Sequence, residues 1–150
     1  MKHIQRWYTF DDLDVGDEFV SATHTVSETD ITQFAGLTGD FHELHTSRVF
    51  AANTRFGERI AHGLLILSLA NGLYVRLNLF ETSVFLGIDE WKSTKPVFIG
   101  DTIHLRLTIS EKRLSRDGGR GIFGMKYEVL NQNDELVAVG LFHRMLSVSK

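Results

Sequence analysis

The apolar segment that follows Gly63 constrains the fold of this chain more than any other feature. Residues 64–77 read LLILSLANGLYVRL and are apolar on nearly every face of a helix. Such a helix is expected to be enclosed by other elements, because a helix on a protein surface keeps one polar face. Asn71 and Arg76 interrupt the segment, which is also shorter than the roughly 20 apolar residues of a membrane span. We therefore expect a soluble domain built around one central helix.

Beyond this segment the pattern changes from helical periodicity to the alternation typical of strands. Alternating apolar residues occur at Ile103–Ile109, Phe123–Val129 and Val137–Leu141. Turn-forming sequences at 117–119 and 131–134 separate these runs and predict hairpins. The single proline, Pro96, breaks the chain between two strands. The second half therefore predicts a meander of about four strands whose apolar faces need a cover.

The first half predicts a strand followed by short helices. Residues 19–26 alternate like a strand, and Ser27 with Asp30 forms the capping box of a helix over residues 28–37. A loop follows, and then a second helical piece at 48–53. We expect residues 1–150 to form a single α+β domain, in which a curved antiparallel sheet wraps around one long central helix.

Composition argues against several classes of function. The chain has 150 residues and a formal net charge of −3, so it lacks the basic surface of a nucleic-acid-binding protein. It has no cysteine, which excludes disulfides and thiolate metal sites and permits a reducing compartment. Its first residues are acidic and lack the apolar core of a signal peptide. We expect a cytoplasmic protein without nucleic-acid or membrane partners.

A series of short motifs gives the chain a recognisable pattern. In chain order they are Phe34, Thr38-Gly39-Asp40, Leu44-His45, Phe56-Gly57 and Ala61-His62-Gly63. This pattern resembles the MaoC-like dehydratase family, which includes the (R)-specific enoyl-CoA hydratases. The chain departs from the family at His42-Glu43, where the family has Asn-Pro.

The resemblance implies a hot-dog fold and a lyase of fatty acid metabolism that adds water to a 2-enoyl-CoA thioester, or removes it. It implies an acyl-CoA substrate, no cofactor, and a homodimer or a hexamer of dimers. Open sheet edges also favour pairing with a second copy.

The resemblance makes Asp40 and His45 the catalytic pair. Histidine is the natural proton carrier at neutral pH, and a positioned acid–base pair supplies roughly 10²–10⁴-fold. His45 would activate the water, and Asp40 would bind it and deliver the proton. The exchange of these roles stays open, because a coupled pair titrates as one unit. The backbone N–H of Gly63 would form the oxyanion hole, since a helix N-terminus favours negative charge.

Other residues are expected to support the site or to contact the substrate. His42 and His62 are candidates for site support, and Phe34, Phe56 and Ser68 for substrate binding, although Ser68 also fits the helix core. The CoA phosphates need cations at the rim, for which the candidates are Arg48, Arg59, Lys92 and Lys95.

Three alternatives remain at the level of sequence. The first two are a hot-dog thioesterase and a non-catalytic acyl-CoA-binding subunit. The third treats Asp40 as an Asx-turn residue and His45 as a surface histidine. We expect no metal, because HELH lacks the spacing of the HExxH zinc motif and no third strong ligand stands nearby.

Overall fold

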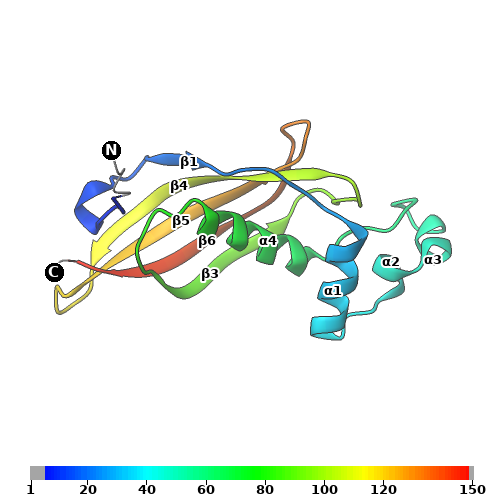
Figure 1. The fold of residues 1–150 in the computed structure, drawn as a ribbon, viewed down its shortest axis with the longest axis horizontal. Helices are drawn as coiled ribbons and strands as arrows, with labels where there is room; N and C mark the ends of the chain where they lie inside the picture. Colours follow the sequence, from blue (N-terminus) through cyan, green and yellow to red (C-terminus); the bar gives the residue numbers. More distant parts are fainter. Residues whose placement is uncertain (1–5, 149–150) are drawn as a thin grey trace, which may run out of the picture.

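The computed structural model describes residues 6–148 and shows a long sheet with one helix lying against its face (Figure 1). This arrangement confirms the predicted α+β class. The elements follow the order η1 (a 3-10 helix, Phe10–Asp12), β1 (Glu18–Val20), β2 (His24–Thr25), α1 (Glu28–Thr38), α2 (Glu43–Thr46), α3 (Arg48–Ala52), α4 (Gly63–Arg76), β3 (Val84–Ser93), β4 (Thr102–Leu114), β5 (Arg120–Leu130) and β6 (Leu136–Ser147).

The sheet is antiparallel throughout, with the strand order β1-β4-β5-β6-β3, and β2 also pairs with β4. Strands β4 to β6 form the predicted meander. Strand β3 does not precede β4 in the sheet, as a continuous meander would require, but pairs with β6 at the opposite edge. The segment that contains Pro96 carries the chain across the sheet, and Val97 O accepts a hydrogen bond from Ala61 N there.

The predicted strand at 19–26 is two short strands, so the expectation of one continuous strand was wrong. Between β1 and β2, Ser21 N donates to Leu105 O at 2.9 Å, and Leu105 N donates to the Ser21 hydroxyl at 2.8 Å. The side-chain oxygen takes the place of a backbone carbonyl in the ladder. This side-chain hydrogen bond ends β1 and lets the chain bend before β2.

The N-terminal half otherwise follows its sequence signals. Asp30 N donates to the Ser27 hydroxyl at 3.1 Å, and Ser27 N donates to the Asp30 carboxylate at 2.9 Å, which is the predicted capping box. Helix α1 ends at Gly39, whose φ of 82° is favourable for glycine. Helices α1, α2 and α3 gather at one end of the sheet, beside the first turn of α4 (Figure 1). Helix α2 lies inside the segment that the sequence predicted as a loop.

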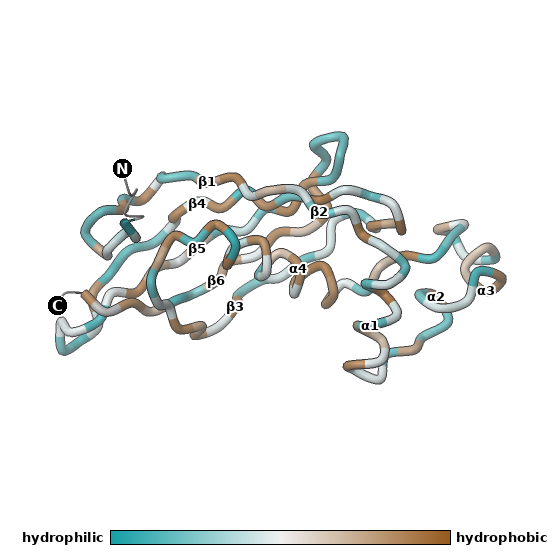
Figure 2. Tube along the Cα trace, viewed as in Figure 1, coloured by the Kyte–Doolittle hydropathy of each residue, from teal (hydrophilic) through white to brown (hydrophobic). Residues whose placement is uncertain are grey.

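Helix α4 starts at Gly63 as predicted and buries one face against the sheet, through Leu65, Ile66, Ala70, Leu73 and Tyr74. Figure 2 shows hydrophobic residues along α4, β1 and β4, and hydrophilic ones in the turns that follow β4 and β5. The prediction that the helix is enclosed on all sides was wrong for this single chain. Leu64 is 63% exposed and Val75 is 59% exposed, because the sheet covers only one side of the helix. None of the helices within residues 6–148 has the length and apolar character needed to cross a membrane.

Strand β6 also corrects the sequence interpretation. Beyond Val137 its buried face consists of Ala138, Gly140, Phe142, Arg144 and Leu146, whereas Val139 and Leu141 are only half-buried. Small inward residues leave room for aromatic rings, because a Cβ on Gly140 would lie 2.7 Å from the Trp91 ring. The larger side chains therefore do not mark the inner face of this strand.

Candidate active site

Three hydrogen bonds bring the segment before α4 against the segment around α2. His45 Nδ1 lies 2.7 Å from Ile60 O, Ile60 N lies 3.4 Å from Leu44 O, and His62 Nε2 lies 2.9 Å from Asp40 O. Residues 40–45 are thereby tied to residues 60–62. Asp40 and His45, which the sequence paired, lie together at the N-terminus of α4.

The surroundings of His45 favour a neutral ring with a free acceptor nitrogen. A carbonyl can only accept, so Nδ1 carries the proton toward Ile60 O and Nε2 is left unprotonated. Partial burial lowers the pKa of His45 below its ordinary value, and the neighbouring His62 and His42 lower it further. The Ile60 carbonyl and the Asp40 charge oppose this pKa shift in part. The ring is therefore suited to accept a proton at neutral pH.

Asp40 is exposed and faces the two histidines. One carboxylate oxygen of Asp40 and one ring nitrogen each of His45 and His62 lie within 4.8 Å of one another. A water molecule can bridge groups at such a separation. The Asp40 carboxylate also accepts from His42 N at 3.3 Å, so the Asx turn that the sequence offered as an alternative is present alongside this pairing.

The ring of His62 is buried and packs against the ring of His45. It is 2% exposed, and its ring stacks on that of His45 with centroids 3.9 Å apart. Its Nε2–H donates to Asp40 O, while its Nδ1 is buried and has no hydrogen-bond partner in the part of the chain that the structure describes. Phe34 packs edge-on against His62 at 4.9 Å. Phe34 therefore supports the histidine and is not among the residues that line the adjacent cavity.

The His42-Glu43 departure keeps the local turn intact. His42 Nδ1 accepts a hydrogen bond from Leu44 N at 3.0 Å and so caps α2. Glu43 occupies the first position of this helix, where an acidic side chain suits the helix dipole. His42 thus makes a hydrogen bond of the kind that an asparagine makes at a helix N-cap.

A cavity of about 270 Å³ opens beside His45 and Gly63. A hydrogen-bond acceptor for the Gly63 N–H is absent among the described residues, as expected for the first turn of a helix. Phe56 lines the cavity as predicted, whereas Ser68 does not. Ser68 is exposed on the outer face of α4, and its hydroxyl donates to Leu64 O at 2.9 Å, so it belongs neither to the cavity nor to the core. The lining comprises His45, Arg55, Phe56, Ile60, Ala61, Gly63, Ile66, Ser93, Thr94, Lys95, Pro96, Val97 and Val137.

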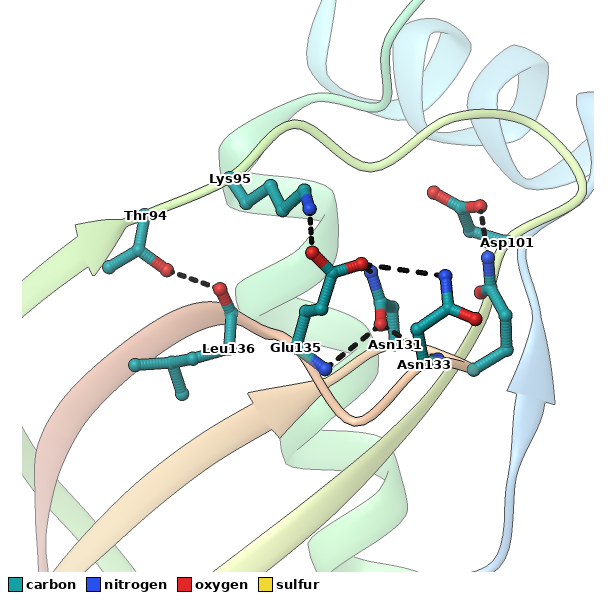
Figure 3. A network of polar contacts seen from close by, with 8 residues as sticks. Thr94, Lys95, Asp101, Asn131, Asn133, Glu135 and Leu136 are labelled. Carbon is teal, nitrogen blue, oxygen red and sulfur yellow. Dashed lines mark hydrogen bonds and ion pairs between the residues drawn. The ribbon is translucent and has the colours of Figure 1, made fainter.

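One cavity wall, residues 93–97, is held from outside by the turn between β5 and β6 (Figure 3). The Lys95 ammonium pairs with the Glu135 carboxylate, and the Thr94 hydroxyl donates to Leu136 O at 2.7 Å. Asn131 Nδ2 donates to the same Glu135 side chain at 3.2 Å. The turn therefore fixes both the wall and the one cation within it.

The remaining candidate cations lie in different surroundings. Arg59 donates to Glu28 at 2.9 Å, and neither Arg48 nor Lys92 lines the cavity. The sequence interpretation missed Arg55, which lines the cavity with its guanidinium 4.7 Å from the Phe56 ring centroid. Its place directly before Phe56-Gly57 was the available signal.

The trio of Asp40, His45 and His62 bears on metal binding. The premise that no third ligand stands nearby was wrong, because His62 approaches from a segment that is distant in sequence. Ligand atoms about 2.1 Å from one zinc ion lie at most about 4.2 Å apart. The candidate ligand atoms of the trio all lie within 4.8 Å of one another. The expectation of a metal-free site stays a prediction.

The fold and the site together define a class: a hot-dog domain with a histidine–carboxylate pair at the start of its central helix. The chain belongs to the MaoC like domain family, whose model matches residues 13–129.

Curated relatives share the family at moderate identity. Protein MaoC of Klebsiella aerogenes is 36% identical over 103 residues, which are 69% of this chain and 31% of that protein. The 3-hydroxybutyryl-CoA dehydratase of Methylorubrum extorquens is 33% identical over 68% of this chain and 64% of its own length. The chain thus spans less than two thirds of either relative.

Solved structures share the fold over nearly the whole chain. An Archaeoglobus protein described as a monoamine oxidase regulatory protein has a TM-score of 0.90 at 36% identity, covering 96% of this chain and 97% of its own. The MaoC-like dehydratase of Rhodospirillum rubrum has a TM-score of 0.87 at 27% identity, covering 95% and 99%. The (R)-hydratase of Aeromonas caviae has a TM-score of 0.75 at 28% identity, covering 88% and 96%.

Proposed function

We propose that this protein is an acyl-CoA hydratase or dehydratase that adds water to a 2-enoyl-CoA thioester, or removes it. Membership of a family that includes hydratases and dehydratases supports this reaction type. The observation that carries the proposal is the hydrogen bond from His45 Nδ1 to Ile60 O. It leaves Nε2 of a neutral ring as a base beside the Asp40 carboxylate.

The proposed mechanism uses three groups. His45 Nε2 accepts a proton from a water held between His45 and Asp40, and the hydroxide adds to C3 of the enoyl group. Negative charge moves to the thioester oxygen, where the Gly63 N–H donates to it. A proton then passes from the acid–base pair to C2, so that one water has been added and both side chains regain their starting states.

The test is a panel of 2-enoyl-CoA substrates with the wild type, Asp40→Asn and His45→Gln. We expect hydration by the wild type and a loss of about 10²–10⁴-fold in each variant, with unchanged circular dichroism. Hydration that survives both substitutions would remove the pair from the mechanism.

The same panel separates the alternatives. Release of free CoA thiol would identify a thioesterase. Acyl-CoA binding without turnover of any substrate would identify a non-catalytic binding subunit. Either result overturns the hydratase proposal.

We also propose that the chain forms a homodimer, alone or as the unit of a hexamer. Strand β3 is an edge strand, and its first three residues, Val84, Phe85 and Leu86, are exposed large apolar side chains. An exposed apolar patch at an open sheet edge suits a second copy. Light scattering should give twice the chain mass for the wild type or a multiple of it, and the monomer mass for Leu86→Glu. A wild type that is monomeric at micromolar concentration would refute this assembly.

A further inference from the structure

Arg144 is a buried cation that the proposed mechanism does not use. It projects from β6 toward α4 and is 4% exposed. Its Nη2 donates to the Asn71 side chain and lies 3.5 Å from the Tyr127 hydroxyl, while its guanidinium lies 4.1 Å from the Tyr74 ring centroid. Its Nε is buried without a hydrogen-bond partner within residues 6–148.

Every partner of this guanidinium is neutral. None of the ion pairs formed within residues 6–148 includes Arg144. Burial raises the pKa of both Tyr74 and Tyr127, so neither phenol supplies a negative charge. A buried charge is costly unless it is paired. The planar guanidinium is the side chain best matched to a carboxylate.

Helix α4 connects Arg144 to the candidate active site. Gly63, Leu67 and Asn71 are spaced four residues apart and share one face of this helix. Leu67 and Asn71 are only half-buried, unlike the core residues beside them. Asn71 lies about 12 Å along the helix axis from Gly63, at about 1.5 Å per residue. The half-buried residues Leu67 and Asn71 therefore lie along α4 between the proposed oxyanion donor and the contact with Arg144.

We propose that Arg144 binds a carboxylate at the far end of the acyl group, so that the preferred substrates are ω-carboxy-2-enoyl thioesters. This proposal rests on the hydratase function and specifies its substrate class. Because the guanidinium contacts Asn71, we take the axial separation of about 12 Å between Gly63 and Asn71 as the distance that the substrate has to span. A hydrogen bond of about 3 Å to the guanidinium leaves about 9 Å of this distance for the acyl group. An extended chain advances about 1.2 Å per bond, a third of the span of an extended residue. The matching acyl group has about eight carbons.

The experiment compares 2-octenoyl-CoA with its ω-carboxy analogue, 2-octenedioyl-CoA. We expect the wild type to prefer the analogue in kcat/KM by about tenfold or more, the scale of a charge-assisted hydrogen bond. Arg144→Met should lose about 10- to 100-fold on the analogue and should keep hydration of 2-octenoyl-CoA within threefold or so of the wild type. Arg76→Met, which removes an exposed arginine from helix α4, is the matched control and should leave the preference unchanged.

A second variant lets the protein itself supply a negative charge to Arg144. Asn71→Asp places a carboxylate where the amide now contacts Arg144. We expect it to raise the melting temperature and to abolish the preference for the analogue. This variant keeps the proposal testable even where Arg144→Met fails to fold.

The outcomes separate the two proposals. Hydration of 2-octenoyl-CoA without any preference for the analogue, or a preference that survives Arg144→Met, overturns the role of Arg144 and leaves the hydratase function standing. Failure to hydrate these two substrates or any other 2-enoyl-CoA of the panel refutes the function. Calorimetric binding of a saturated ω-carboxyoctanoyl-CoA then tests whether Arg144 binds the carboxylate. That role is refuted if Arg144→Met binds this ligand as tightly as the wild type does. If Arg144→Met loses the dimer and keeps its substrate selectivity, the carboxylate that Arg144 binds belongs to a second copy of the chain. This result would also overturn the proposal.

Discussion

Replacing Gly63 by alanine tests the oxyanion hole with little disturbance of the fold. A Cβ at this position would lie 3.1 Å from the Ser93 hydroxyl oxygen, so Ser93 has to move by a few tenths of an ångström. We expect the free energy of unfolding to change by less than about 1 kcal/mol and the melting temperature by less than about 4 °C.

The effect on catalysis should be much larger. Alanine keeps the N–H at this position, but its methyl group would enter the cavity beside that donor and keep the thioester oxygen away from it, and a lost oxyanion contact costs about 10²–10³ in rate. We expect Gly63→Ala to reduce kcat for hydration of 2-butenoyl-CoA by about that factor, measured as loss of the enoyl thioester absorbance. Thermal unfolding of the same sample reports on the fold.

Ser93→Ala and the double variant serve as controls for this experiment. If the methyl group acts by excluding the thioester, the double variant stays as slow as Gly63→Ala. Full recovery in the double variant would trace the loss to the displaced hydroxyl. That recovery, or a Gly63→Ala enzyme within about threefold of the wild type, would refute the reasoning.

Three further predictions concern pH, the α2 cap and packing. The lowered pKa of His45 should place the acid limb of kcat/KM below 6.5, because only the neutral ring is a base. The free energy of unfolding should also fall as pH decreases from 6.5 to that lowered pKa, since the unfolded chain binds the extra proton first; a flat profile there would contradict the assignment. His42→Ala should cost about 1 kcal/mol in thermal unfolding through loss of the α2 cap, whereas His42→Asn should keep it; equal losses would argue against capping. Gly121→Ala should cost about 1–3 kcal/mol in urea unfolding, because its Cβ would lie 2.1 Å from the Phe10 ring, whereas Gly87→Ala meets nothing within 4 Å and should be neutral.

Local rules were sufficient for the elements whose signals lie within a few residues. The capping box at Ser27, the start of α4 at Gly63 and the alternation from Ile103 to Ile109 all occur as predicted. These features depend on hydrogen bonds and side-chain periodicity near each residue. The pairing of Asp40 with His45, in contrast, came from the resemblance to a known family.

The errors share a different cause, which is contact between distant segments. His62 lies 22 residues from Asp40 along the chain, yet it donates to the Asp40 carbonyl. The inner face of β6 was misjudged because glycine leaves space there for Trp91 from another strand. Arg144 gave no signal in its own neighbourhood, since its contacts come from α4 and β5. Pairing across the sheet determines such features, and the periodicity of a single segment does not predict how that segment pairs with others.

The pair formed by Lys95 and Glu135 has a consequence for how sequence changes reach the substrate. An exposed hairpin usually tolerates substitution freely. Here the hairpin between β5 and β6 influences the cavity from outside it, because Glu135 pairs with Lys95, which lines the cavity. Relatives that differ in this turn would therefore differ in affinity for the anionic part of the ligand, even where every residue around His45 is the same.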